Sequence, residues 1–261
     1  MKYAKKSLGQ NFLIDKNIIK KIINLIEIKN KNVIEIGPGE GALTEEILKN
    51  KPKSLSVIEK DLQLANQLKF KNSKNKIIKI YNDDILHFNL EKINKKRTVI
   101  LGNLPYNISS QILVKILKFN KWPPNFSDLI LMFQKELGEK IIGEYTSSNY
   151  GRLSILSNYR LNVLDKFLVS PNCFFPKPKV TSMVIHFQPI KKIKFKIKDI
   201  NNLEKVTNIL FSNKRKMINK NIKKILTNDE IKKIDNLNLS SRPSEIKSEL
   251  YYKITELYEK K

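Results

Sequence analysis

The sequence of 261 residues is poor in several residue types on which protein chemistry often depends. It has a single cysteine, which excludes an internal disulfide framework. With one cysteine and two histidines, a His/Cys metal site is not expected. No run of about 18 apolar residues is present, so no membrane-spanning helix is expected, and the start, MKYAKKSLGQNFL, lacks the apolar core of a signal peptide. We therefore expect a soluble cytoplasmic protein without a metal or a membrane partner.

Acidic residues are scarce relative to basic ones. The chain has 25 Asp and Glu against 50 Lys and Arg, a net charge of +25. A charge of this size concerns partners rather than fold, and it favours a polyanion such as nucleic acid over an anionic membrane. Part of the lysine excess follows the general richness in Lys, Ile and Asn and is expected to be solvated surface. Hydrophobic residues make up 41% of the chain, enough for a substantial core.

Strand-like and helix-like segments alternate along the first 140 residues. This order predicts a mostly parallel sheet with helices on both faces, the doubly wound α/β class. A later alternating segment, 179–189, is predicted as an antiparallel strand. From residue 190 onward the periodicity is helical, so we predict a catalytic domain at 1–189 and a small all-helical domain at 190–261. The expected strands are 32–37, 54–61, 76–86, 98–103 and one beginning at 128, and the expected helices are 17–28, 42–50, 61–70 and 109–119.

Three consecutive strand ends carry residues suited to a nucleoside. VIEIGPGEGALT places Gly37 at the first strand–helix turn, in a G-x-G-x-G pattern that is not the dinucleotide fingerprint. Glu59 ends the second strand, where doubly wound folds place an acid against ribose hydroxyls. Asp84 follows the third strand and offers an acceptor to an adenine amine. The spacing favours S-adenosylmethionine over a dinucleotide; the alternatives are an ordinary turn at the glycines and capping roles for the two acids.

The fourth strand ends in GNLPYNISS, residues 102–110. Asn103 and the carbonyl of Leu104 offer hydrogen-bond acceptors to the exocyclic amine of an adenine, and Tyr106 offers a stacking face for a base taken out of its helix. Holding the amine in line with a methyl donor is the kind of positioning that speeds a poor nucleophile. The alternative is a turn stiffened by proline with the tyrosine in the core. Two other residues, His186 and Cys173, are predicted to be structural.

Nine motifs occur along the chain in the order QNFL, IEIGPGEGALT, VIEKD, GNLPYNISS, FQKE, YGRLS, FFPKPKVTS, FSNKRKMINKNI and RPSEI. Together they resemble the KsgA (RsmA) family of ribosomal RNA adenine N6,N6-dimethyltransferases. The resemblance implies a Rossmann-like methyltransferase domain with a seven-stranded sheet, and donor-binding roles for Asn11, Leu13, Gly37, Glu59, Asp84 and Asn103. It implies catalytic roles for Asn103, Leu104 and Tyr106, and a second stacking face at Phe174, ahead of Phe175.

The resemblance also implies a substrate. The implied reaction is the dimethylation of two adjacent adenosines in a hairpin near the 3′ end of 16S rRNA, in the 30S particle. The implied enzyme is a monomer that uses S-adenosylmethionine and no metal. Candidate phosphate contacts are Lys5, Lys6 and the segment 191–224, which has twelve Lys or Arg and two acids. Two alternatives remain at this point: an Erm-type methyltransferase acting on 23S rRNA, and a non-catalytic RNA-binding assembly factor on the same fold. A DNA adenine methyltransferase fits less well, because NLPY replaces the [DN]PPY form.

Overall fold

The computed structural model describes residues 9–260. The predicted phosphate contacts Lys5 and Lys6 lie outside the described residues. The described chain forms two compact units, one made of residues 9–138 and 163–189 and the other of residues 139–162 and 190–260. Residues 139–162 pack with the helices of the second unit. The predicted division into domains 1–189 and 190–261 stays a prediction.

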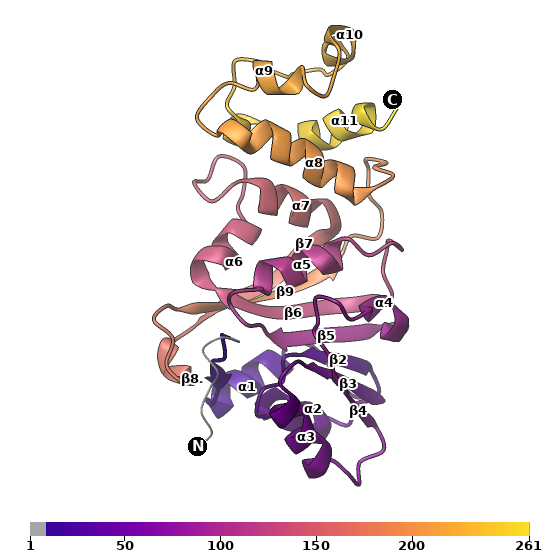
Figure 1. The fold of residues 1–261 in the computed structure, drawn as a ribbon, viewed down its shortest axis with the longest axis vertical. Coiled ribbons are helices and arrows are strands. Elements are labelled where there is room, and N and C mark those ends of the chain that lie inside the picture. Colours follow the sequence, from indigo (N-terminus) through magenta and orange to yellow (C-terminus); the bar gives the residue numbers. More distant parts are fainter. Residues whose placement is uncertain (1–8, 261) are drawn as a thin grey trace. The chain divides into compact units, whose positions relative to one another are not determined.

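The first unit is built on a seven-stranded sheet with the strand order β4-β3-β2-β5-β6-β9-β7 (Figure 1). The first five of these strands run parallel, and β9 runs antiparallel to β6, as the alternation of residues 179–189 predicts. The predicted fold class and the seven-stranded sheet are confirmed. The strands are β2 (Asn32–Ile36), β3 (Ser54–Glu59), β4 (Ile78–Asn82), β5 (Thr98–Asn103), β6 (Phe126–Gln134), β7 (Leu161–Val169) and β9 (Ser182–Pro189).

The predicted helices 42–50, 61–70 and 109–119 follow their strands as expected, whereas two short helices, 90–93 and 135–141, were not predicted. Asp15 and Asp61 begin two of them by accepting hydrogen bonds from backbone N–H groups in the first turn. The first helix ends at Ile23 rather than near residue 28, because Asn24 caps it. The helices of this part are α1 (Lys16–Ile23), α2 (Ala42–Lys49), α3 (Leu62–Lys71), α4 (Leu90–Ile93), α5 (Ser109–Leu117) and α6 (Lys135–Ile141), whose last residues belong to the second unit.

Both faces of the sheet are covered. On one face, Val33, Val57 and Leu101 pack in a core cluster with residues of α1 and α2 such as Ile23 and Ile47. The intervening strand residues, for example Ile34, Ile100 and Leu131, are also buried. Strands buried on both faces are typical of doubly wound proteins, whose ligands bind beyond the carboxyl ends of the strands.

A separate two-stranded sheet pairs β1 (Phe12–Leu13) with β8 (Phe174–Phe175). The strands are antiparallel, with Phe12 opposite Phe175 and Leu13 opposite Phe174. A short 3₁₀ turn, η2 (Pro171–Cys173), precedes β8, and the Cys173 carbonyl accepts from the Ile14 N–H at 2.9 Å. This sheet ties the QNFL segment to the FFPKPKV segment, which lies about 160 residues later in the sequence.

The second unit is helical. Tyr252 donates to the Ile155 carbonyl at 3.0 Å, Tyr150 donates to the Ile246 carbonyl at 2.8 Å, and the Tyr159 and Tyr252 rings are 5.0 Å apart. These contacts hold residues 139–162 against the later helices, which is why that segment belongs to this unit. Its elements are α7 (Arg152–Arg160), α8 (Ile200–Leu210), η3 (Phe211–Asn213), α9 (Asn219–Ile222), α10 (Asn228–Lys232), η4 (Pro243–Glu245) and α11 (Ser248–Tyr258).

Candidate functional site

A cavity of about 710 Å³ opens at the carboxyl ends of β2, β3, β4 and β5 in the first unit. Eight of the nine predicted site residues line it; Phe174 does not. The cavity also has charged residues of α1 and α2 on its wall. The predicted residues that line it are Asn11, Leu13, Gly37, Glu59, Asp84, Asn103, Leu104 and Tyr106.

The loop between β2 and α2 is approached closely by two other segments. Gly37 has φ +66°, and a Cβ on it would lie 3.7 Å from the Asn103 carbonyl oxygen and 3.7 Å from Pro105 Cδ. Gly39 has φ +59°, and a Cβ on it would lie only 2.7 Å from Phe12 Cδ1. The positive φ therefore favours glycine at both positions, and at Gly39 a side chain would also collide with Phe12. The loop, the NLPY turn and β1 form adjoining walls of the cavity.

Glu59 ends β3 and is 6% exposed. Its carboxylate accepts from the Gly39 N–H at 3.1 Å and from the Asp61 N–H at 2.8 Å. Burial raises the pKa of Glu59, and the backbone hydrogen bonds oppose that rise only in part. The carboxylate is thus fixed between the glycine loop and the start of α3, where its remaining lone pairs can accept from the hydroxyls of a ribose.

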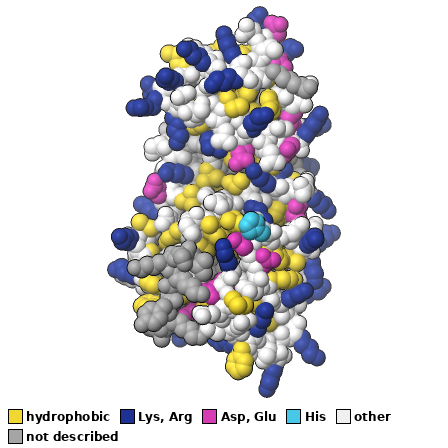
Figure 2. All heavy atoms as spheres, in the orientation of Figure 1, with side chains coloured by type: hydrophobic (Ala, Val, Ile, Leu, Met, Phe, Trp, Pro, Cys, Tyr) yellow, Lys and Arg dark blue, Asp and Glu magenta, His cyan; other side chains and the backbone are white. Residues whose placement is uncertain are grey.

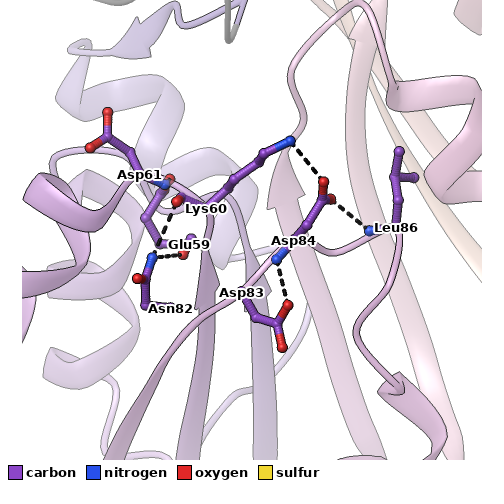
Figure 3. A network of polar contacts seen from close by, with 7 residues as sticks. All are labelled: Glu59, Lys60, Asp61, Asn82, Asp83, Asp84 and Leu86. Atoms are coloured by element: carbon purple, nitrogen blue, oxygen red, sulfur yellow. Dashed lines mark hydrogen bonds and ion pairs between the residues drawn. The ribbon is translucent and has the colours of Figure 1, made fainter.

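Asp84 follows β4 and is held by an ion pair. Its Oδ2 is 2.8 Å from Lys60 Nζ, and its Oδ1 accepts from the Leu86 N–H at 2.9 Å (Figure 3). The hydrogen bond from Lys60 lowers the pKa of Asp84, so the group is an ionised acceptor at neutral pH. Asp83 caps the turn by accepting from the Asp84 N–H at 2.7 Å. Both aspartates therefore accept from backbone N–H groups of the turn, and both line the cavity, so the donor-binding role of Asp84 stays a prediction.

The end of β3 is held to the end of β4 by one amide. Asn82 Nδ2 donates to the Glu59 carbonyl at 3.0 Å and to the Lys60 carbonyl at 3.1 Å (Figure 3). The two carboxylates at these strand ends, Glu59 and Asp84, are consequently placed by backbone contacts rather than by flexible loops.

The NLPY turn contacts β1 through Asn103. Asn103 Nδ2 donates to the Asn11 carbonyl at 3.0 Å, which leaves its amide oxygen as the acceptor. The Tyr106 hydroxyl lies 2.6 Å from Ser182 Oγ, and burial raises the pKa of this phenol, so it is neutral at physiological pH. Ser182, at the start of β9, was not among the predicted site residues, because nothing in its sequence context indicates that it meets a tyrosine 76 residues away. The contact with Ser182 fixes the hydroxyl end of the Tyr106 side chain, which lines the cavity.

Phe174, predicted as a second stacking face, is buried. Its side chain is 3% exposed and packs in the core cluster with Leu13, and its stacking role stays a prediction. Phe175 is 41% exposed. Successive residues of a strand point to opposite faces, and the neighbouring Leu13 and Phe174 take the buried one. This alternation was a signal that only one phenylalanine of FFP faces the core, although it did not say which.

Other residues predicted to be structural are buried away from the cavity. His186 Nε2 is 2.9 Å from Asp128 Oδ1, and Gln188 donates to the same oxygen at 3.2 Å. Burial would raise the pKa of Asp128, but these side-chain hydrogen bonds outweigh it and the pKa is lowered. Cys173 is buried, which raises the pKa of its thiol and disfavours the nucleophilic thiolate.

The described residues, 9–260, contain neither a metal-binding cluster nor a membrane-spanning helix. Among these residues no three His, Cys, Asp or Glu side chains are grouped so as to hold a metal ion. None of the described helices is long and apolar enough to cross a membrane.

Comparison with known proteins places the chain in a family. The family model described as "Ribosomal RNA adenine dimethylase" matches residues 1–260. The chain belongs to this family. It is 48% identical over 260 residues to the "Ribosomal RNA small subunit methyltransferase A" of Pelagibacter ubique, covering 98% of this chain and 97% of the relative. It is 40% identical over 260 residues to the protein of the same name from Malacoplasma penetrans, covering 97% and 91%. The predicted resemblance is confirmed over nearly the whole chain.

Two solved structures share the fold. A dimethyladenosine transferase from Plasmodium falciparum superimposes with a TM-score of 0.78 at 24% identity, covering 93% of this chain and 95% of the other. The 23S rRNA methyltransferase ErmE superimposes with a TM-score of 0.71 at 22% identity, covering 95% and 100%. At these identities the likeness shows the fold, a Rossmann-like methyltransferase domain followed by helices. Membership of the dimethylase family identifies the chain as an enzyme, an S-adenosylmethionine-dependent rRNA adenine dimethyltransferase.

Proposed function

We propose that this protein dimethylates N6 of two adjacent adenosines in a hairpin near the 3′ end of 16S rRNA, within the 30S particle. The observation that carries the proposal is the meeting of the NLPY turn, the glycine loop and Glu59 on one cavity. The relatives named small subunit methyltransferase A, at 40–48% identity, support the small-subunit substrate over the large-subunit one. The ErmE likeness, at 22% identity, concerns the fold.

The cavity residues suit S-adenosylmethionine, which when bound supplies a methyl group on a positively charged sulfur. Glu59 would accept from the ribose hydroxyls, and Asp84 from the amine of the donor's adenine. Asn11, Leu13 and Gly37 would form the remaining wall. The combination of two carboxylates at strand ends with a glycine loop on one cavity supports this assignment.

Asn103, Leu104 and Tyr106 would act on the target adenosine. The Asn103 amide oxygen and the Leu104 carbonyl would accept from the two N–H groups of N6 and hold its lone pair in line with the methyl group. Tyr106 would stack on the flipped base. The methylated amine is acidic enough to lose its proton to water or to a backbone acceptor, so the site needs no strong base.

RNA recognition is proposed to involve the second unit. Its segment 191–224 carries twelve Lys or Arg and two acids, Asp199 and Glu204. On the face drawn in Figure 2, Lys and Arg side chains clearly outnumber Asp and Glu. Neutralising phosphates supplies most of the sequence-independent affinity for RNA. We place the reaction in the cytoplasm, where the substrate particle is found, and propose that the enzyme acts as a monomer.

Mapping the transferred methyl group tests the function. Purified protein is incubated with labelled S-adenosylmethionine and with unmethylated 30S or 50S particles, and the labelled nucleotides are identified. We expect label only in 16S rRNA, on two adjacent adenosines as N6,N6-dimethyladenosine. Label in 23S rRNA would favour the Erm-type alternative. Particle binding without label would favour the non-catalytic assembly factor.

Glu59→Ala is expected to weaken S-adenosylmethionine binding by about 1.5–3 kcal/mol, roughly 10- to 150-fold, because a charge-assisted hydrogen bond is lost. The measurement is calorimetric titration. Glu27→Ala, which removes an exposed carboxylate from the same unit and does not border the cavity, is the control and should bind the donor normally. An unchanged affinity in Glu59→Ala would remove Glu59 from the donor site.

A further inference from the structure

Phe175 is a large apolar side chain that the fold leaves uncovered. It is 41% exposed, although its neighbour Phe174 is 3% exposed. The two belong to β8, and consecutive side chains of a strand point in opposite directions. Since Phe174 supplies the core contact at this point, packing in the first unit does not account for the exposed ring.

The register of the small sheet places Phe175 beside the cavity wall. Phe175 is paired with Phe12 across the two strands, and directly opposed residues share one face of a sheet. Phe12 lines the cavity, and its ring lies over Gly39 in the glycine loop. The exposed ring therefore lies next to Phe12 of the cavity wall, on its β8 side, without lining the cavity itself.

The chain segment that contains Phe175 carries positive charge only, and the nearest acid that contacts it is Asp15, 3.8 Å from Cys173 Sγ. The segment 170–181, SPNCFFPKPKVT, contains Lys177 and Lys179 and no acid. Both lysines are exposed, whereas Pro178 between them is buried and anchors the segment. An exposed aromatic ring followed by two cations on a backbone stiffened by two prolines is suited to a polyanion with flat groups.

We propose that Phe175, Lys177 and Lys179 bind an unpaired nucleotide of the RNA next to the one being methylated. Its base stacks on Phe175, and the lysines contact the flanking phosphates. The inference rests on the proposed function and extends it by assigning a second, non-reacting nucleotide to the enzyme. Every base has a stacking face, so this subsite tolerates any base and selects for single-stranded RNA. Charge and continuity with the cavity favour RNA over a protein as the occupant.

Ring substitutions separate stacking from ordinary apolar contact. Phe175→Ala and Phe175→Leu are expected to weaken binding to unmethylated 30S particles about 5- to 150-fold, the range for loss of one stacked base. Phe175→Tyr retains the ring and should bind within about 2-fold of the unsubstituted protein. The control is Phe70→Ala, which removes an aromatic ring that is 86% exposed on α3 and does not border the cavity.

Charge substitutions test the phosphate contacts. Log affinity falls as log salt concentration rises, and the double variant Lys177→Ala/Lys179→Ala should make this negative slope shallower by about 1.4. That is about 0.7 for each contact to a single strand. Lys74→Ala/Lys76→Ala has the same spacing and charge loss in an exposed loop before β4, and it should change the slope much less. Calorimetric affinity for S-adenosylmethionine should be unchanged in every variant, because none of the substituted residues borders the cavity.

The outcomes distinguish this inference from the proposed function, because particle binding is measured without methyl transfer. If the protein methylates 16S rRNA and Phe175→Ala binds particles normally, the subsite is wrong and the function stands. If no methyl group is transferred but the Phe175 variants lose binding, the function fails and the subsite stands. Full binding by Phe175→Leu would also overturn the proposal, because an aliphatic side chain cannot provide the stacking face.

Discussion

Asn103→Ala is expected to lower the single-turnover rate of methyl transfer about 100-fold or more. Its amide nitrogen is occupied by the Asn11 carbonyl at 3.0 Å, so the amide oxygen is the group left to accept from N6. That hydrogen bond matters most when the nitrogen lone pair is being drawn toward the methyl group. An interaction realised chiefly in the transition state lowers turnover more than binding when it is lost. The expected loss of rate is that seen when one preorganised polar group is removed from other active sites.

The measurement is the rate of methylation of unmethylated 30S particles with enzyme in excess over RNA. Particle affinity should change little, because phosphate contacts elsewhere dominate it. Donor affinity should fall modestly, since Asn103 also fixes the Asn11 segment of the cavity. Asn17→Ala, an exposed asparagine of α1 that does not border the cavity, is the control. A normal rate in Asn103→Ala would mean that the turn is structural.

The sequence was sufficient to place the parallel strands, because each ends at a residue with a distinctive role. Glu59 and Asn103 are the last residues of β3 and β5, and Gly37 follows β2 directly. Parallel strands bring their carboxyl ends to one edge, so local patterns also predicted that these residues meet. The edge strand β7 was missed. Its residues from Asn162 to Lys166 are exposed on both faces, so the run does not alternate.

The contacts that the sequence could not predict join segments far apart in the chain. Ser182 meets Tyr106, and β8 pairs with β1, through tertiary packing that has no local signal. The choice between Phe174 and Phe175 also depended on that pairing, because the register decides which ring faces the core. The packing of residues 139–162 in the second unit has no local signal either. Their tyrosine contacts are with residues about 100 positions later.

Glu35 is a carboxyl group buried in β2, two residues before the glycine loop. It is 0% exposed, and Thr44 of α2 donates to its Oε2 at 2.6 Å. Its other oxygen, Oε1, is buried without a hydrogen-bond partner. Burial raises the pKa of Glu35 to about 7, with a smaller contribution from the nearby charge of Glu59, while the hydrogen bond from Thr44 opposes the rise.

The raised pKa makes the stability of the first unit depend on pH. Below pH 4.5, the ordinary value, Glu35 is protonated in both the folded and the unfolded chain and has no effect. As the pH rises from 4.5 to about 7, the unfolded chain loses the proton while the folded chain retains it, so the free energy of unfolding falls. Above about pH 7 the loss is complete, and a shift of this size corresponds to about 3 kcal/mol.

Glu35→Gln should remove this dependence, because glutamine has the shape and neutrality of the protonated acid and can still accept from Thr44. We expect the free energy of unfolding to rise by about 3 kcal/mol at pH 8.5 and to change by less than about 1 kcal/mol at pH 5. The measurement is urea unfolding followed by fluorescence of Trp122, which is the single tryptophan of the chain and lies in the first unit. Glu27→Gln, which removes an exposed carboxyl from the same unit, is the control and should change stability by less than about 0.5 kcal/mol at both pH values. An equal effect of Glu35→Gln at both pH values would mean that the buried carboxyl keeps one protonation state from pH 5 to pH 8.5. Its burial would then not make the stability of the first unit depend on pH.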